Sequence, residues 1–352
     1  MTNVNQPDKH TIFFATRPIG PPWDEASKNL VYQIVQNMDT FSFILLTYAG
    51  ENTLLDKSTV IEKKIYSRTK SRQVTWGQKL SFFINLIMSN ASIYHFYFTP
   101  ELYSSRILRI IKKFKKGKFL QTFATPLKKT EMIPHLAFGD AIVVQSDHSL
   151  QNMAKNGVQT AQRIYLAVDT DTVKPGIDIK ATKNRLNIGP SQRVIIYAGN
   201  YYLGCNDDLI KTIVTLCKKD KTLTFILACR IANPEEDLPE RARVEKALQD
   251  AQLAGQIIFL EQVENMLQLL ALADIHIFPA RKMFSKADIP LVLLESLALE
   301  TPVIITDIPP LNEIMKDDVG ELIPVGDVGR LVDAISKLLD NPLLRQEKGK
   351  RG

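Results

Sequence analysis

IIFLEQVENMLQLLALADIHIFPA, residues 257–280, contains a complete strand–helix–strand unit. Its hydrophobic pattern and punctuation predict strands at Ile257–Leu260 and Ile275–Pro279, with a helix over 264–272 between them. A short helix that joins two strands is the connection that parallel strands require. This segment therefore predicts a parallel α/β sheet.

The same alternation extends outward from this unit in both directions. Strands and helices alternate from His10 to Leu166 and again from Arg193 to Pro324. Several of the strands are continuous apolar runs, such as TIFFA, FILL and AIVV, which is typical of strands covered on both faces. The whole chain is therefore predicted to consist of parallel sheets with helices on both sides.

The segment Asp169–Pro190 interrupts this rhythm with prolines, glycines and scattered charges, and it is the best candidate for a linker. We expect two Rossmann-like, doubly wound α/β domains that face a cleft, residues 1–172 and 173–352. In such sheets ligands bind beyond the carboxyl ends of the strands, so the loops at those ends are the candidate site.

Composition excludes several other classes of protein. With 352 residues, 45% hydrophobic and 23% charged, the chain has the composition of a globular protein with room for two cores, which argues against disorder or a fibre. Lys and Arg outnumber Asp and Glu by 22 to 13 in residues 1–176, whereas residues 177–352 hold 22 against 25. The basic excess belongs to the first half.

No sequence feature indicates a membrane-spanning or secreted protein. The longest apolar window, Leu80–Met88, is much shorter than the roughly 18–20 residues that a spanning helix needs. The polar start MTNVNQPDKH lacks the apolar core of a signal peptide, so a cytoplasmic location is expected. Cys205, Cys217 and Cys229 form no CxxC pair, which argues against a disulfide framework or a zinc site.

Two carboxyl-end loops of the second domain are candidates for binding an anion. Gly199 and Gly204 follow the strand 193–199 and precede a helix, so they form either a phosphate seat or an ordinary turn. Arg230 ends the neighbouring strand, where it binds an anion or is simply solvated.

The stretch DIPLVLLESLALETPV, residues 288–303, raises the sharpest question because Glu295 lies among leucines. Pro290 suits the first turn of a helix over 290–299, and Asp288 is placed to cap it. An ionised carboxylate in apolar surroundings costs several kcal/mol unless it meets donors or reaches solvent. Glu295 therefore either binds the hydroxyls of a ligand or extends to the surface.

From Arg193 onward the chain resembles the family-four retaining glycosyltransferases of the GT-B fold, and its first half resembles them more loosely through residues 138–158. The resembling runs appear in the family's order. They are RIYLAVDTDTVKP (163–175), RVIIYAGN (193–200), IIFLEQVENMLQLLALADIHIFPA (257–280), DIPLVLLESLALETPVIITD (288–307) and GELIPVGDVGRLVDAISKLLDNPLLR (320–345).

The resemblance implies a nucleotide-diphosphate sugar as donor and no cofactor, with the glutamate that matches Glu295 accepting hydrogen bonds from the donor's ribose. Catalytic roles are expected for Asp288, Arg230 and Glu295. The residues expected to bind the donor are Gly199, Asn200, Arg230, Val263, Lys286, Asp288, Ile289, Pro290, Leu291 and Glu295.

The sequence also departs from the family's pattern. A second glutamate usually lies eight residues before the one that matches Glu295, and Ala287 occupies that position. The loop NYYLGCNDD lacks the usual Arg and Lys, for which Arg230 and Lys282 or Lys286 are candidate replacements. The usual histidine after the strand that begins at Phe119 is replaced by Ala124 or Thr125.

In the first domain, the loop TRPIGPPWDEASKNL offers Gly20 and Trp23 as contacts for an acceptor sugar or lipid head group, with Trp23 as a packed anchor the alternative. His95 lies on a neighbouring aromatic strand and is assigned to the acceptor side, although such a histidine is more often packed.

The segment ELYSSRILRIIKKFKKGK, residues 101–118, predicts an amphipathic helix over 101–116. Arg106, Arg109, Lys113 and Lys116 share one face, opposite an apolar stripe. This helix either rests on an anionic membrane surface, as a peripheral contact on the inner face of the cell membrane, or packs on its sheet with a solvated basic face. A nucleic acid partner is disfavoured, because neither interleaved aromatic side chains nor a known binding motif accompanies these charges.

The resemblance implies a retaining hexosyltransferase. We expect it to act without a metal, because Asp169-Thr170-Asp171, which has the DxD spacing that binds manganese in another glycosyltransferase fold, falls in the predicted linker. Its acceptor would be a glycan or a lipid-linked molecule. Two alternatives stay open: a binding or scaffold protein that has lost catalysis, and a nucleotide-sugar epimerase.

Overall fold

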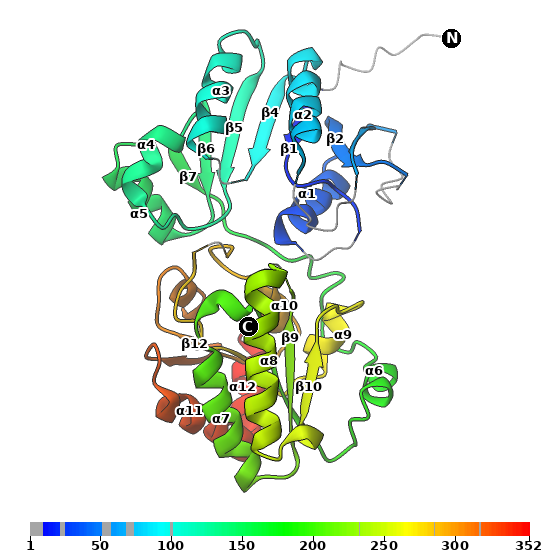
Figure 1. The fold of residues 1–352 in the computed structure, drawn as a ribbon, viewed down its shortest axis with the longest axis vertical. Coiled ribbons are helices and arrows are strands. Elements are labelled where there is room, and N and C mark those ends of the chain that lie inside the picture. The colour runs from blue at the N-terminus through cyan, green and yellow to red at the C-terminus, as the bar shows by residue number, and fades with distance from the viewer. Residues whose placement is uncertain are drawn as a thin grey trace. The chain divides into compact units, whose positions relative to one another are not determined.

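The computed structural model describes residues 10–21, 25–50, 58–67, 74–98, 101–231, 233–284, 286–316 and 318–352, without the side chain of Ala254. The chain divides into two compact units, Met1–Tyr165 and Leu166–Gly352 (Figure 1). The sequence prediction placed this division between residues 172 and 173. Each unit is built around its own parallel sheet.

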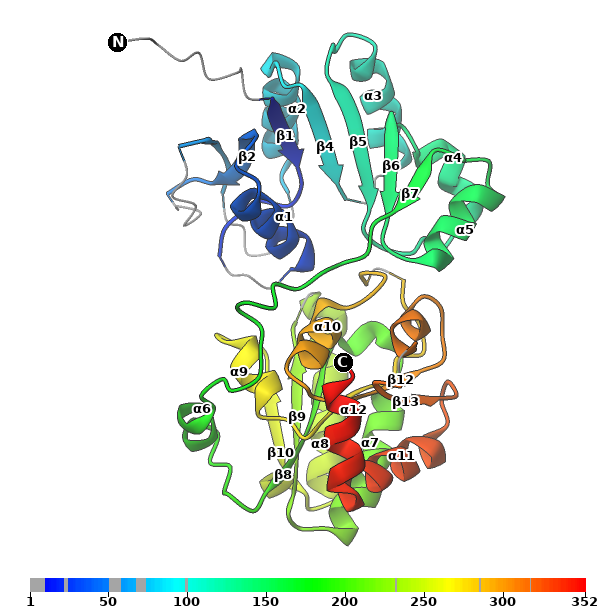
Figure 2. The same cartoon turned by 180° about the vertical axis from the view of Figure 1, so that it is seen from behind.

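Unit 1 contains a seven-stranded parallel sheet in the order β3-β2-β1-β4-β5-β6-β7 (Figure 2). Its strands are β1 Thr11–Ala15, β2 Ser42–Tyr48, β3 Val60–Tyr66, β4 Ile93–Tyr97, β5 Lys118–Phe123, β6 Ala141–Val144 and β7 Ala161–Arg163. Its described helices are α1 Ala26–Asn37, α2 Trp76–Met88, α3 Leu102–Lys112, η1 Thr130–Met132, α4 Ile133–Leu136 and α5 Asp147–Lys155.

Apolar side chains cover both faces of this sheet, as the continuous apolar strands predict. On one face, Leu86 of α2 and Leu108 of α3 pack with Phe13, Tyr94 and other sheet residues. On the other face, residues of α1 pack with the alternate side chains of β1 and β2.

Unit 2 contains a six-stranded parallel sheet in the order β10-β9-β8-β11-β12-β13. Its strands are β8 Arg193–Gly199, β9 Leu223–Cys229, β10 Ile257–Leu260, β11 Ile275–Phe278, β12 Val303–Thr306 and β13 Gly320–Ile323. Its described helices are α6 Lys180–Arg185, η2 Tyr201–Leu203, α7 Asn206–Lys219, α8 Pro234–Asp250, η3 Ala254–Gln256, α9 Met266–Ala271, α10 Leu291–Ala298, η4 Leu311–Met315, α11 Val328–Asp340 and α12 Pro342–Lys350.

These two sheets confirm the predicted α/β class with doubly wound topology. In unit 2 the strand order reverses between β8 and β11, which makes this the point where an open α/β sheet binds its ligand. The corresponding reversal in unit 1 lies between β1 and β4.

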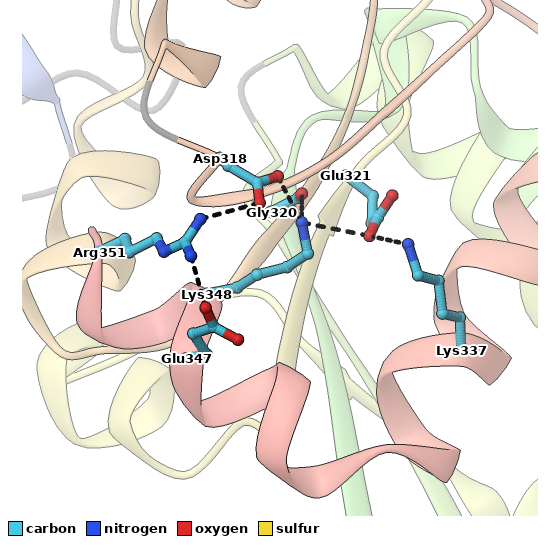
Figure 3. Close-up of polar contacts among 7 residues, drawn as sticks. All are labelled: Asp318, Gly320, Glu321, Lys337, Glu347, Lys348 and Arg351. Atoms are coloured by element: carbon cyan, nitrogen blue, oxygen red, sulfur yellow. Dashed lines mark hydrogen bonds and ion pairs between the residues drawn. The ribbon is translucent and has the colours of Figure 1, made fainter.

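Helix α12 is attached to unit 2 by a largely buried lysine (Figure 3). The Lys348 ammonium donates to Asp318 at 2.6 Å and to the backbone oxygen of Gly320 at 2.8 Å, and it lies 3.3 Å from Glu321. Next to it, a Cβ at Gly349 would lie 2.1 Å from the backbone oxygen of Glu300. The helix therefore lies directly against the backbone that follows α10.

The structure differs from the sequence prediction in a few elements. Helices α6 and α12 were not predicted, because KATKNR and PLLRQEKGK carry too few apolar residues to show a helical stripe. The helix predicted over 309–316 is the short 3-10 helix η4, and the one predicted over 101–116 ends at Lys112. No described helix is both long and apolar enough to cross a bilayer.

Candidate functional site

Glu295 lies on α10, whose other side chains are mostly apolar. The side chain is partly buried, and among the described residues no hydrogen bond or ion pair reaches its carboxyl group. Burial disfavours the charged form and raises the pKa of Glu295 to about 7. At neutral pH the group is therefore only partly ionised, and a partner that donates hydrogen bonds to it would favour the charged form.

Asp288 does not cap α10, so that prediction is wrong. The helix begins at Leu291 with Pro290 in the N-cap position, and no side chain caps it. Asp288 is instead fully buried, and Ile289 beside it is 4% exposed. The short segment before α10 is thus packed into unit 2 and holds the start of the helix in place.

The carboxyl end of β8 is shaped by a tyrosine that lies against a glycine. A Cβ at Gly199 would lie 2.3 Å from Cζ of Tyr197, so only glycine fits there. The Tyr197 hydroxyl donates to the backbone oxygen of Asn200 at 3.0 Å. The turn after β8 is therefore fixed, and Asn200 is buried at the edge of the sheet.

Strand register brings the predicted cation to the same edge. Gly199 of β8 pairs with Cys229 of β9, so Asn200 and Arg230 leave their strands at neighbouring positions. Because the strands are parallel, both residues lie at the ligand-binding edge.

Lys286 joins this group from the loop after β11. Its ammonium donates to Oδ1 of Asn200 at 2.9 Å. Burial, and secondly the charge of Arg230, lower the pKa of Lys286 to about 8. Within the described part of the chain, no carboxylate pairs with Lys286. The structure therefore brings Asn200, Arg230 and Lys286 together as a cationic cluster, and Lys286 rather than Lys282 makes the contact with Asn200.

Sequence reasoning missed an ion pair that supports the same loop. Nε and Nη2 of Arg281 donate to the two carboxylate oxygens of Asp208, each at 2.7 Å. Asp208 is buried in the first turn of α7. This helix begins shortly after Gly204, whose φ is +78°. The two adjacent acidic residues at the start of this helix were the available signal for a salt bridge.

His276 is a second residue that the sequence did not reveal. It is fully buried on β11, and its Nδ1 is hydrogen-bonded at 2.7 Å to Oγ of Ser296, the residue after Glu295. Burial, and to a lesser degree the charge of Lys286, lower the pKa of His276 to about 3. A neutral imidazole thus holds α10 against the sheet and fixes the rotation of the helix that carries Glu295.

The remaining donor-side candidates are packing residues in this structure. Val263 packs with Val292 of α10 in one apolar cluster that covers a face of the sheet, and Leu291 is half-buried at the start of α10. No described contact links Val263 or Leu291 to Lys286. Their assignment to the donor site stays a prediction.

The acceptor-side candidates lie in unit 1. Gly20 has φ +143°, a conformation that favours glycine, and its oxygen accepts a 3.5 Å hydrogen bond from Lys28. His95 is buried in the middle of β4, with Nε2 2.9 Å from Oγ1 of Thr122 and its ring 4.9 Å from that of Phe14.

This environment lowers the pKa of His95 to about 4 and matches the packed alternative. Trp23 lies outside the described residues. In the described part of the chain, His, Cys, Asp and Glu side chains form no group of three or more that could hold a metal ion.

Comparison with known proteins relates unit 2 to a sugar-transferring family. Residues 178–352 match the family model described as "Glycosyl transferases group 1". A curated relative from Bacillus anthracis, N-acetyl-alpha-D-glucosaminyl L-malate synthase, is 23% identical over 249 residues, 64% of this chain and 62% of the relative. Phosphatidyl-myo-inositol mannosyltransferase of Mycobacterium leprae is 33% identical over 95 residues, 27% and 25% of the two chains. The chain thus spans less than two thirds of the length of these relatives.

Solved structures share the fold over almost the whole chain. A glycosyltransferase from Rickettsia africae superposes with a TM-score of 0.74 at 15% identity, covering 97% of this chain and 92% of that one. HepE of Anabaena, solved in complex with UDP-glucose, gives 0.76 at 14% identity, with 97% and 93% covered. At this level of identity, the likeness shows a shared two-sheet architecture.

Proposed function

Because this chain belongs, through residues 178–352, to the group 1 glycosyl transferases, we propose that it moves a hexose from a nucleotide-diphosphate sugar to an acceptor with retention of configuration. The acceptor in this proposal is a glycan or a lipid-linked molecule. One curated relative is named as a phosphatidyl-myo-inositol mannosyltransferase, which supports the lipid-linked class, whereas the name of the other contains L-malate, a small acid.

One observation carries the proposal. Glu295 is a partly buried carboxyl group on an apolar helix, and no described protein group hydrogen-bonds it. A vicinal diol supplies two donors to one carboxylate, which would offset the cost of ionising it there. A nucleoside ribose presents such a diol.

The cationic cluster supports a diphosphate beside that ribose. Lys286 has an amide oxygen and no described carboxylate as its partner, and Arg230 lies close enough to lower its pKa. The charge of Arg230 lowers the pKa of Lys286, so an anion bound beside both cations would favour the protonated form of Lys286. A donor diphosphate would therefore bind at Asn200, Arg230 and Lys286.

The proposed reaction uses this charge to stabilise the leaving group. Arg230 and Lys286 hold the diphosphate as its bond to the anomeric carbon breaks. The acceptor hydroxyl attacks the same face of the sugar, and its proton passes to an oxygen of the departing diphosphate. Each well-placed cation contributes roughly 2–4 kcal/mol to such a transition state in a water-excluded site. Asp288, buried one residue after Ala287, is the candidate for the contact with the sugar.

Thermal-shift and calorimetric titrations of Glu295→Gln test the proposal, with UDP and UDP-glucose as probes. Loss of a charge-assisted hydrogen bond of roughly 1.5–3 kcal/mol should weaken UDP at least tenfold. The variant's own melting temperature should stay equal or rise, because a buried ionisable group is removed. Glu300→Gln, an exposed carboxylate at the end of the same helix, serves as the matched control and should bind UDP like the parent protein.

The same panel separates the alternative functions. A scaffold protein would show no rise in melting temperature with any nucleoside diphosphate. An epimerase would convert the sugar of the donor without an acceptor, which chromatography of the donor detects. Either result alone would overturn the transferase proposal, and a large loss of stability in Glu295→Gln with UDP binding intact would show that Glu295 is a packing residue.

A further inference from the structure

Two helices of unit 1 present their outer faces side by side. Leu86 of α2 and Leu108 of α3 pack into one cluster on the same face of the sheet, where Figures 1 and 2 also place both helices. The Lys115 ammonium, just past α3, donates to the backbone oxygen of Ile87 at 2.6 Å and also to that of Ser89. This bond joins the carboxyl ends of the two helices.

The outer faces of both helices are apolar, although the inner faces already fill the core. Trp76 is 79% exposed and Phe114 is 83% exposed, values that leave almost the whole side chain in water. We call this set of exposed side chains the α2–α3 patch. It consists of Trp76, Leu80, Ile84, Ile87 and Met88 from α2, and Tyr103, Ile110 and Phe114 from α3 and the residues after it.

Its spacing shows that the patch is one surface rather than scattered residues. On α2 the members follow one another at intervals of three and four, which places them along one side of the helix. On α3, Tyr103 and Ile110 are seven residues apart and share one side of the helix, and Phe114 is exposed just after the helix ends. Adjacent apolar side chains of this number on a soluble unit mark a site of interaction.

The charged side chains on the two segments that carry the patch are all basic, whereas Glu101 immediately precedes α3. Residues 76–88 and 102–118 contain no Asp or Glu. Arg109 and Lys112 turn inward to backbone oxygens of residues 134–138. Arg106, Lys113 and Lys116 are exposed and have no described ion pair.

From these observations we infer that the α2–α3 patch docks on the surface of a lipid bilayer that contains anionic lipids. Exposed aromatic and aliphatic side chains enter the boundary of head groups and acyl chains, while Lys and Arg remain at the phosphate level. A second copy of this chain would bring two basic rims together, so like-charge repulsion disfavours that occupant.

Helix 101–116 was predicted from sequence to separate a basic face from an apolar one. In the structure Ile107 and Ile111 are half-buried, whereas Tyr103, Ile110 and Phe114 face outward next to Arg106 and Lys113. The docking surface also includes α2, which sequence analysis did not single out. The inference uses no donor-binding residue, so it goes beyond the proposed function and stands or falls separately from it.

Sedimentation with vesicles tests the inference, using phosphatidylcholine alone and phosphatidylcholine mixed with phosphatidylglycerol. The full chain should sediment with the anionic vesicles, and added salt should weaken this binding. Trp76 provides a second measurement, because the chain has two tryptophans and Trp23→Phe leaves Trp76 as the single reporter. Its emission should shift to the blue with anionic vesicles.

Paired variants divide the apolar and the charged contributions. Ile110→Ser with Phe114→Ser should abolish measurable sedimentation, and Lys113→Gln with Lys116→Gln should weaken it about fivefold for each charge removed. All four side chains are exposed, so melting temperatures should stay within a degree or two of the parent. Leu343→Ser, which changes a 79% exposed leucine on α12 of unit 2, is the matched control and should bind like the parent.

Three results would overturn the inference. The first is a parent protein that sediments with neither kind of vesicle. The second is binding that survives the Ile110/Phe114 change as well as it survives Leu343→Ser. The third is concentration-dependent dimerisation, measured by ultracentrifugation, that the Ile110/Phe114 change abolishes, because the patch would then be a contact between copies.

Discussion

Glu295 and Lys286 show how single side chains can be tuned by what surrounds them. Glu295 lies on α10 and Lys286 in the loop after β11, and burial moves the pKa of each toward that of the other. The carboxyl group needs its ionised form to accept hydroxyl donors, whereas the ammonium needs its proton to bind phosphate. In the proposed site, donor binding would therefore depend on both protonation states at once.

We predict a bell-shaped dependence of UDP-glucose affinity on pH. Affinity should rise as pH increases through about 7, where Glu295 ionises, and fall above about 8, where Lys286 loses its proton. UDP-glucose is the suitable probe because its diphosphate has no proton that titrates in this range. Calorimetric titration between pH 6 and 9 measures the profile.

The matched variants identify each limb of that profile. Glu295→Gln should remove the acid limb and leave the alkaline one, and Lys286→Met should do the reverse. A limb that persists in its own variant would show that another group is responsible.

At the scale of the element, α12 shows how a polar helix can be a stable part of a core domain. Lys348 is buried while Lys350 on the same helix is exposed, and the ammonium of Lys348 contacts Asp318, Gly320 and Glu321 (Figure 3). A buried cation that loses its partners, or partners that lose their cation, cost more than an exposed pair. The attachment of α12 to the rest of unit 2 should therefore depend mainly on Lys348.

Lys348→Met should lower the free energy of unfolding by about 1–3 kcal/mol, as measured by urea denaturation. The loss is expected to stay below that of a fully buried pair, because Asp318 is exposed and Glu321 keeps Lys337 at 2.8 Å. Lys350→Met is the control and should change stability by less than about 0.5 kcal/mol. Equal effects of the two changes would contradict the role assigned to Lys348.

The elements also show what a sequence can and cannot predict. Strands such as Arg193–Gly199 and Val303–Thr306 were predicted within a residue, because buried parallel strands are continuous apolar runs. Helix α12 was missed because its stability comes from a tertiary contact of Lys348 and not from an apolar stripe. Local pattern identifies an element only where the pattern itself supplies the stability.

For the whole molecule, the two units have separate hydrophobic cores. The described apolar clusters contain residues of one unit or the other, never of both. All the candidate donor residues belong to unit 2, whereas the α2–α3 patch belongs to unit 1. Donor binding and docking should thus be separable.

Residues 166–352, expressed without unit 1, should unfold in one cooperative transition and keep measurable affinity for UDP. Circular dichroism during heating and calorimetric titration are the measurements, and Glu295→Gln in the same fragment is the control. A fragment that is folded but does not bind UDP would show that unit 1 contributes to the donor site.

The candidate site could be predicted only in part, because several of its contacts join residues that are far apart in the chain. Glu295 became a candidate because a charge among leucines is visible in the sequence itself, and its contact with the donor stays a prediction. Lys286 was expected to bind the donor while Lys282 stayed an alternative cation for the phosphates, because the contact that separates them is with Asn200, a residue far away in the chain. His276 was missed because one histidine in an apolar strand gives no sign of the helix that it contacts.

The aromatic ring beneath Gly199 has a consequence for how this edge could be redesigned. Tyr197 occupies the volume that any side chain at 199 would enter, so a lysine or arginine can never be introduced at that position without displacing the ring. Positive charge for an anion must be supplied from across the sheet, by neighbouring strands and their loops. Attempts to strengthen anion capture should accordingly alter the loop that carries Lys286 and leave the glycine turn untouched.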